Sequence, residues 1–411
     1  MDLIKMGIKA KETARYAGGL GAGEKNKVLI SCANALCAST DFILSENEKD
    51  LQRADPSRKA FYDRLLLTYD RIEGIAAGLR KLAALDDPVN EVLYTRVMQN
   101  GLEVGEKRVP LGVVGIIYEA RPNVTADSFG LCFKSGNSCI LRGGTDAYNS
   151  NIAIVNVLQE TLHKLGHPRE IVQYITDPKR ETARELMKLN KYVDVLIPRG
   201  GPGLIQSTVE NSTVPVIETG VGNCHIFADE SADIKMAVDI IVNAKTQRPS
   251  VCNACETLLV HKDTASILLP KVCNALTDLN VEIRGDTGVC ELIRNAKPAV
   301  EEDWHEEFLD LILAVKIVEN IDEAIAHIAK YSSGHTEAII TESYKNSRRF
   351  IREVDSAAVM VNASTRFTDG EEFGLGAEIG ISTQKLHARG PMGLKALTTS
   401  KFIVFGQGQI R

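Results

Sequence analysis

Nearly continuous apolar runs alternate with helical segments along much of this chain, and this alternation most limits the folds that it can adopt. Residues 109–118, VPLGVVGIIY, are apolar almost throughout, as expected for a strand buried on both faces of a parallel sheet. A helix over 124–134 and further strands at 138–141, 171–175 and 193–197 follow. The repeated order of strand, turn and helix predicts a doubly wound α/β sheet, whose ligand lies beyond the carboxyl ends of its strands.

The rest of the chain divides into a helical start and a second α/β region. Apolar residues before residue 85 recur at helical spacing, so we expect helices there. Alternation with period two predicts a hairpin within 97–109 and an edge strand at 400–406. Short apolar runs predict strands at 258–260, 281–283, 311–317, 336–340 and 357–361. A chain of 411 residues accommodates two or three such domains.

Cys252 is the candidate nucleophile of this chain. Arg248-Pro249 is predicted to end a helix, Cys252 lies in the polar turn that follows, and residues 256–260 are predicted to form a buried strand. A free thiol has a pKa of about 8.5 and needs nearby positive charge to ionise near neutral pH, which Arg248 could supply locally. Most cysteines are inert core residues, so that alternative stays open. Cys255 makes a C-x-x-C pair with Cys252, but no second such pair occurs and we expect no metal.

Two glycine-rich turns beside arginine predict a dinucleotide site. Glycine lets backbone N–H groups approach a phosphate closely, and the helix after each turn offers its positive end. The G-x-G-x-x-G fingerprint is absent, so each turn could equally be an ordinary connection. The candidate cofactor-binding residues are Arg142, Gly143, Gly144, Arg199, Gly200, Gly201 and Gly203.

Charge, hydropathy and cysteine content limit the partners and the compartment. A net charge of −6 argues against a nucleic-acid surface. No apolar run approaches the roughly 18 residues that cross a bilayer, and the first residues lack signal-peptide features. The nine cysteines are odd in number and scattered, which favours reduced thiols over disulfides. We therefore expect a cytoplasmic protein with neither membrane nor nucleic acid as a partner.

Several longer stretches resemble one known family. Residues 318–339 match its signature most specifically, through Tyr331-Ser332-Ser333 and His335-Thr336-Glu337. Supporting stretches are YEARPNVTADS (118–128), GNCHIFADES (222–231), QRPSVCNACETLLV (247–260), VNASTRFTDGEEFGLGAE (361–378) and STQKLHARGPMGL (382–394). Along essentially its full length the chain resembles the gamma-glutamyl phosphate reductase family of the aldehyde dehydrogenase superfamily.

The resemblance implies an aldehyde dehydrogenase-like α/β fold of two domains with parallel sheets and a small β oligomerisation element. An NADP-binding domain would comprise residues 1–95 and 109–220, and a catalytic domain residues 221–383. The oligomerisation element would comprise 96–108 and 384–411, which suggests a homodimer or a higher homo-oligomer.

The resemblance also implies a reaction. NADPH would reduce L-glutamyl 5-phosphate to L-glutamate 5-semialdehyde and phosphate through a thioester on Cys252, in proline biosynthesis. Glu218 precedes Cys252 by 34 residues, near the superfamily interval, and would assist thiol deprotonation or be a solvated turn residue. Asn123 is a candidate oxyanion donor. Candidates for binding the charged substrate are Arg121, Asn362, Ser364, Lys385, His387 and Arg389.

Two alternative functions stay open. One is another superfamily enzyme that oxidises a semialdehyde or uses coenzyme A as the acyl acceptor. The other is a non-catalytic subunit that keeps the fold and pairs with a glutamate kinase, which is also a possible partner of the active enzyme. Cys252 and both glycine turns are intact, which argues against the non-catalytic alternative.

Overall fold

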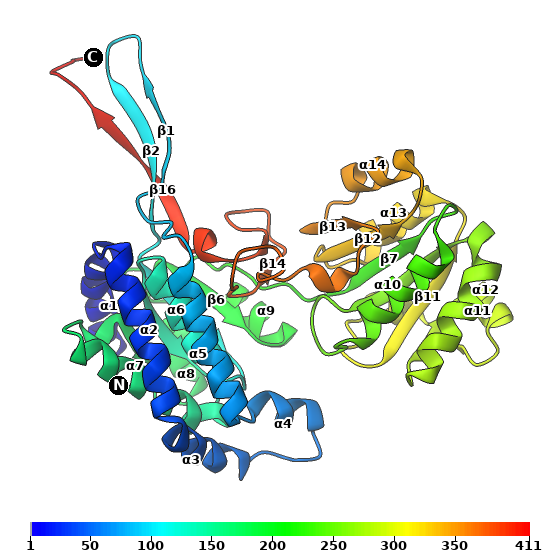
Figure 1. Ribbon diagram of the computed structural model, residues 1–411, viewed down its shortest axis with the longest axis horizontal. Helices are drawn as coiled ribbons and strands as arrows, with labels where there is room; N and C mark the ends of the chain where they lie inside the picture. The colour runs from blue at the N-terminus through cyan, green and yellow to red at the C-terminus, as the bar shows by residue number, and fades with distance from the viewer. Residues whose placement is uncertain (1) are drawn as a thin grey trace. The chain divides into compact units, whose positions relative to one another are not determined.

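The computed structural model describes residues 2–411, which form two compact units. Unit 1 contains residues up to Thr219 together with Gly374–Gly380 and Met392–Arg411, and unit 2 contains Gly220–Phe373 and Ile381–Pro391. Each unit has its own parallel sheet with helices packed against it (Figure 1). The predicted α/β class with parallel sheets is confirmed.

Unit 1 is built on a four-stranded parallel sheet in the order β5-β4-β3-β6. Its strands are β3 Val113–Tyr118, β4 Ser138–Arg142, β5 Val172–Tyr174 and β6 Val195–Arg199. Its helices are α1 Leu3–Gly18, α2 Ala22–Ala38, α3 Thr40–Leu51, α4 Lys59–Leu65, α5 Tyr69–Ala84, α6 Asn123–Lys134, α7 Tyr148–Lys164, α8 Arg180–Leu186 and α9 Pro202–Asn211. The chain moves outward from β3 to β5 and then returns with β6 to the other side of β3. The gap between β3 and β6 is therefore a topological switch point, where ligands of such sheets bind.

Helices α2 and α3 follow each other closely and together form a long apolar stretch. Within residues 2–411, no single helix is long and apolar enough to cross a bilayer. Taken together, α2 and α3 have the length and the composition of a membrane-spanning segment, but a bend of 67° separates them.

A three-stranded antiparallel sheet, here called the arm, also belongs to unit 1. Its order is β1 (Val92–Val97), β2 (Glu103–Pro110) and β16 (Thr398–Phe405), and Figure 1 shows it extending away from the helices of this unit. The predicted hairpin is present, but its first strand begins earlier than expected because Val92 already pairs with Lys107. The predicted edge strand of the tail is confirmed as β16, which pairs with β2 along its whole length.

Unit 2 is built on a seven-stranded parallel sheet in the order β10-β9-β11-β8-β7-β12-β13. Its strands are β7 Cys224–Ala228, β8 Cys255–His261, β9 Glu282–Gly285, β10 Lys297–Pro298, β11 Ile312–Val318, β12 Thr336–Ile340 and β13 Ala358–Val361. Its helices are α10 Ile234–Thr246, α11 Lys262–Asp278, α12 Thr287–Leu292, α13 Ile321–Tyr331 and α14 Tyr344–Glu353. A short pair, β14 (Ile381–Ser382) and β15 (Gly390–Pro391), completes the unit.

The central strands of unit 2 are apolar on both faces because each face has its own core. Alternate side chains of a strand point to opposite faces. Leu258 joins the cluster that α10 and α11 cover, whereas the next residue, Leu259, joins the cluster beneath α13 and α14. Ile226 and Phe227 of β7 divide in the same way. This two-sided burial fixes the register of β7 and β8, on which the candidate active site depends.

Candidate active site

Cys252 lies in a tight turn between α10 and β8. Helix α10 ends at Thr246, shortly before Pro249, whose ring cannot continue a helix. The turn is closed by a hydrogen bond from the Ala254 N–H to the Val251 carbonyl at 3.1 Å. Strand β8 then begins and is buried throughout. The predicted helix end, turn and buried strand are confirmed, and the Cys252 side chain is half-buried.

The start of β7 packs directly on the main chain of Cys252. A Cβ atom at Gly222 would lie 1.7 Å from the Cys252 carbonyl oxygen, so this approach requires glycine. The Cys224 thiol donates a hydrogen bond to the same carbonyl at 3.1 Å. Burial raises the pKa of Cys224 well above its ordinary value, so the thiol retains the proton that it donates. Sequence reasoning singled out neither residue, because no local pattern links them to Cys252.

Asn253 ties the same turn to the 3₁₀ helix η4 (Thr365–Phe367). Its side-chain amide donates to the Thr368 carbonyl at 2.9 Å and to the Arg366 carbonyl at 3.3 Å. The Thr365 hydroxyl donates in return to the Asn253 carbonyl at 2.7 Å. The candidate nucleophile is thus held between β7 and η4, and Asn253 serves to position it.

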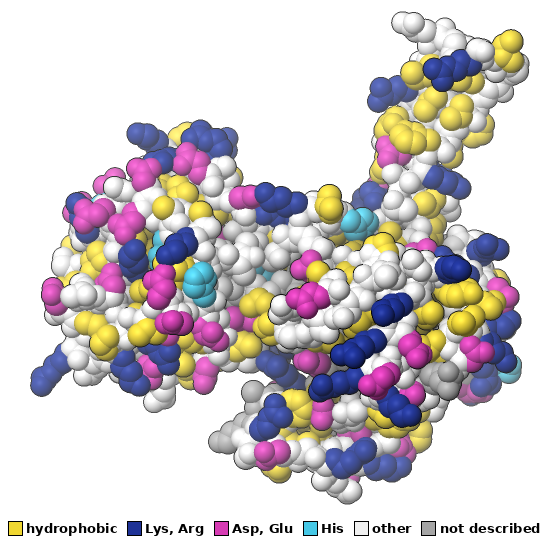
Figure 2. Space-filling view, turned by 180° about the vertical axis from the view of Figure 1, so that it is seen from behind, with side chains coloured by type: hydrophobic (Ala, Val, Ile, Leu, Met, Phe, Trp, Pro, Cys, Tyr) yellow, Lys and Arg dark blue, Asp and Glu magenta, His cyan; other side chains and the backbone are white. Residues whose placement is uncertain are grey.

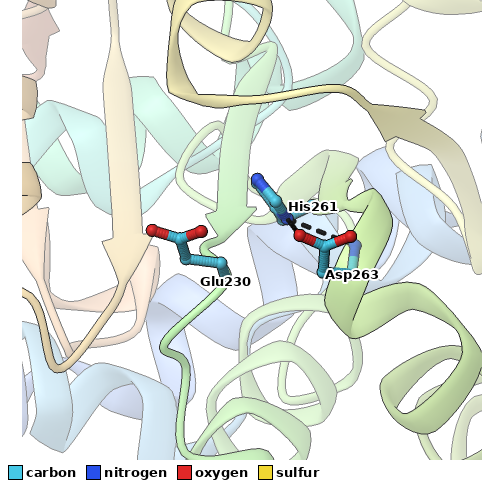
Figure 3. Close-up of side chains that lie close together, drawn as sticks. All are labelled: Glu230, His261 and Asp263. Atoms are coloured by element: carbon cyan, nitrogen blue, oxygen red, sulfur yellow. Dashed lines mark hydrogen bonds and ion pairs between the residues drawn. The ribbon is translucent and has the colours of Figure 1, made fainter.

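This turn lies at the amino edge of the unit 2 sheet, because it precedes β8. A different cluster, formed by Glu230, His261 and Asp263, lies at the carboxyl edge of β7 and β8 (Figure 3). Its ligand-type atoms lie within 4.8 Å of one another. However, His261 Nδ1 accepts the Asp263 N–H at 3.2 Å and so caps α11. We assign this cluster to helix capping.

The unit 1 sheet brings the two predicted glycine turns to its carboxyl edge, on either side of β3. A Cβ atom at Gly143 would lie 2.2 Å from Asn151 Nδ2, and one at Gly200 would lie 2.7 Å from Glu119 Cδ, so close packing requires both glycines. At Gly203 a Cβ atom would meet nothing within 4 Å, so this residue leaves space open at the start of α9.

Glu119 already places an anionic oxygen at the amino end of α9. Its carboxylate accepts the Gly201 N–H at 3.0 Å. A phosphate oxygen would make the same interaction, which the helix dipole favours. The site therefore fits the phosphates of a nicotinamide dinucleotide, whose oxygens would take the place of the Glu119 carboxylate.

Arg142 braces the turn after β4. Its guanidinium donates to the carbonyls of Gly143 at 3.0 Å and Pro178 at 2.8 Å. Burial lowers the pKa of Arg142, although a guanidinium still keeps its charge. Its buried Nε has no hydrogen-bond partner within residues 2–411, which leaves one donor for a ligand.

Asn123 and Glu218 both belong to unit 1. Asn123 begins α6, and its side-chain amide donates to the Asp127 carboxylate at 2.9 Å, which fixes the orientation of the amide. Burial raises the pKa of Asp127 to about 6, against the opposing effects of Asn123 and Arg199. Glu218 follows β6 and is half-buried.

Asn362 and Ser364, two of the predicted substrate-binding residues, hold local structure in unit 2. The Asn362 side chain accepts the Thr341 N–H at 2.8 Å and donates to the Thr341 carbonyl at 2.9 Å, which links the ends of β12 and β13. Ser364 is buried and caps η4 through its hydroxyl.

The four charged candidates lie at the surface of their units. Lys385 and Arg389 both pair with the exposed carboxylate of Asp355, and Arg389 does so at 2.8 Å. His387 is exposed beside them in sequence and has a left-handed backbone, with φ of 65°. Arg121 is exposed in unit 1.

The aldehyde dehydrogenase family profile matches residues 68–307, more than half of the chain. An acetylating aldehyde dehydrogenase from Geobacillus thermoglucosidasius shares the fold, with a TM-score of 0.73 and 19% identity over 100% of this chain and 97% of that one. The chain belongs to the aldehyde dehydrogenase family and is an enzyme.

Relatives of higher sequence identity indicate the group within this family. The chain is 57% identical over 412 residues to the gamma-glutamyl phosphate reductase of Clostridium botulinum, covering 100% of both proteins. It is similar to the crystal structure of gamma-glutamyl phosphate reductase from Thermotoga maritima, with a TM-score of 0.97, 48% identity and 100% of each chain covered. Within its family the chain therefore groups with the gamma-glutamyl phosphate reductases, as its resemblance predicted.

Proposed function

We propose that this protein uses NADPH to reduce L-glutamyl 5-phosphate to L-glutamate 5-semialdehyde and phosphate, a step of proline biosynthesis. The observation that carries the proposal is the buried framework around Cys252, in a chain 57% identical to a curated gamma-glutamyl phosphate reductase. We place the enzyme in the cytoplasm because its nine cysteines are free thiols, which persist in a reducing compartment.

Cys252 performs the covalent chemistry in this proposal. Its thiolate attacks the acyl carbonyl, the bond to the phosphate oxygen breaks, and phosphate leaves with the electron pair. NADPH, when bound, would supply the hydride for reduction of the resulting thioester, and Cys252 would be released as the thiolate when the carbon–sulfur bond breaks to give the aldehyde. The Cys252 N–H and the Asn123 amide are the proposed oxyanion donors, each contributing a factor of about 10²–10³ in rate.

Supporting roles follow from the surroundings of these groups. Asp127 orients the Asn123 amide through their hydrogen bond. Glu218 is proposed to take up the Cys252 proton, since a reductase gains nothing from activating water against the thioester. The phosphates of NADPH would lie at the start of α9 beside Gly200 and Gly201, as the close-packed glycine turn supports.

The remaining candidates are proposed to bind the polar groups of cofactor and substrate. The spare Nε donor of Arg142 would favour the 2′-phosphate of NADPH over NADH. Lys385 and Arg389 would exchange Asp355 for the substrate carboxylate, because one anion can replace another in such a pair. Further polar contacts are assigned to Arg121, Asn362, Ser364 and His387.

The reverse reaction tests the function directly. Purified protein, glutamate 5-semialdehyde and NADP⁺ should form NADPH only when phosphate or arsenate is added. Formation of NADPH without either anion would indicate a hydrolytic aldehyde dehydrogenase. Dependence on coenzyme A would indicate an acylating one, and either result would reject the proposal.

Gly222→Ala is expected to lower the reaction rate although its methyl group would contact no reacting atom. The new methyl group would collide with the Cys252 carbonyl and move the turn, and a 1 Å displacement of a nucleophile costs about 10²-fold in rate. Gly74→Ala in α5 is the matched control, since its Cβ atom meets nothing within 4 Å. Both variants are compared by phosphate-dependent NADPH formation, and a fully active Gly222→Ala enzyme would contradict the close packing.

The arm is proposed to join copies of this chain. Figure 2 shows hydrophobic side chains along the arm. Its strands carry Val97, Phe402 and Phe405, which are 73%, 67% and 62% exposed. Such a sheet with open edges and apolar side chains favours pairing with another copy. Phe402→Asp should reduce the molar mass measured by light scattering, whereas Tyr344→Asp, at a position 79% exposed in α14, should not. An unchanged mass for Phe402→Asp would remove the arm from the interface.

A further inference from the structure

Arg366 is fixed beside the candidate nucleophile by the hydrogen bonds of its own main chain. Its carbonyl accepts from the Asn253 amide at 3.3 Å, and Asn253 directly follows Cys252. The Asn253 carbonyl in turn accepts the hydroxyl of Thr365, the residue before Arg366, at 2.7 Å. Although Arg366 lies more than one hundred residues further along the chain, its backbone therefore belongs to the nucleophile turn.

The side chain of Arg366 is oriented toward the same turn. Its Nε donates to the Gln247 side chain at 3.0 Å, at the end of α10 and five residues before Cys252. Burial and then the charge of Arg248 lower the pKa of Arg366, whereas Cys252 and then Asp369 raise it. A guanidinium keeps its charge in a protein, so Arg366 places a permanent positive charge near the half-buried Cys252.

Arg366 is half-buried, and a positive charge in such a place favours an anion beside it. A Cys252 thiolate provides one such anion in the free enzyme. The acyl phosphate of the proposed substrate brings another, and two of its phosphate oxygens can accept the paired N–H groups of a planar guanidinium.

We propose that Arg366 stabilises the Cys252 thiolate and binds the phosphate group of the incoming acyl phosphate. The role in phosphate binding rests on the proposed function, whereas the role in stabilising the thiolate does not. When the sulfur forms its bond to the acyl carbon, the carbon–oxygen bond to phosphate breaks and the electron pair leaves on the phosphate oxygen. Arg366 neutralises that charge, so no proton has to be supplied to the leaving group.

The test compares Arg366→Gln and Arg366→Lys with Arg352→Gln, a control at an exposed position of α14. The first measurement is the pH dependence of Cys252 alkylation by iodoacetamide, followed by mass spectrometry of its peptide. In Arg366→Gln we expect alkylation at pH 7 to slow about tenfold, because loss of one nearby opposite charge shifts a pKa by about one unit or more. Arg366→Lys keeps the charge and should slow it less.

The second measurement is the KM for inorganic phosphate in the reverse reaction. Arg366→Gln should raise this KM about tenfold or more. Arg366→Lys should raise it as well, because a lysine ammonium cannot make the bidentate contact of a guanidinium with phosphate. An unchanged alkylation profile together with an unchanged KM would overturn the inference. If Arg366→Gln fails to fold, as judged by circular dichroism, Arg366→Lys decides through the KM. A wild-type enzyme that does not use phosphate would refute the proposed function, while alkylation would still test the thiolate role.

Discussion

Cys252→Ser is expected to lower phosphate-dependent NADPH formation by about 10⁴-fold or more. A serine hydroxyl is scarcely ionised near neutral pH, whereas the proposed reaction begins with attack by a thiolate. Binding of NADPH should persist, because the glycine turns that are proposed to hold it belong to unit 1. The quenching or shift of nicotinamide fluorescence on binding measures this separately from turnover.

Cys255→Ser is the matched control, only three residues away. The Cys255 side chain is fully buried, and burial raises the pKa of its thiol far above the ordinary value. Its sulfur donates to the Thr257 carbonyl at 3.4 Å, a bond that a serine hydroxyl can also make. We therefore expect activity close to wild type. A dead Cys255→Ser enzyme beside an active Cys252→Ser enzyme would reverse the assignment.

Lys245→Met is expected to lower the free energy of unfolding of unit 2 by about 3–5 kcal/mol. Lys245 of α10 and Glu256 of β8 form an ion pair at 2.5 Å, and both side chains are completely buried. Burial raises the pKa of Glu256, and the Lys245 ammonium opposes that rise. Removing the ammonium leaves a buried carboxylate without its partner, which is the costly way to break such a pair.

Trp304 lies in unit 2 and is the only tryptophan of the chain, so its fluorescence during urea unfolding reports on this unit. Lys262→Met is the control, because Lys262 pairs with Glu319 at the surface, where solvent screens the pair, and its loss should leave the free energy of unfolding nearly unchanged. The double variant Lys245→Met with Glu256→Leu should recover much of the loss. Equal stability of Lys245→Met and the Lys262→Met control would show that the buried pair contributes nothing.

Much of the fold was accessible from local patterns. The continuous apolar run of β3 predicted a strand buried on both faces, and the period of two predicted the arm and its edge strand. The start of the hairpin was placed too late, because the pairing of Val92 with Lys107 extends it beyond the alternating stretch. The strand β7 was not singled out at all, although it lies inside its sheet, between β8 and β12.

By itself, the sequence determined that Cys252 would lie in a turn between a helix and a buried strand. Pro249 cannot continue a helix, and an apolar run can only be buried, so both facts act locally. Only the tertiary structure decided what surrounds that turn: the close approach of Gly222, the Cys224 thiol and the Arg366 side chain. Two of these contacts end on main-chain atoms, which every residue has. A local sequence pattern therefore cannot predict which distant segments will contact these main-chain atoms.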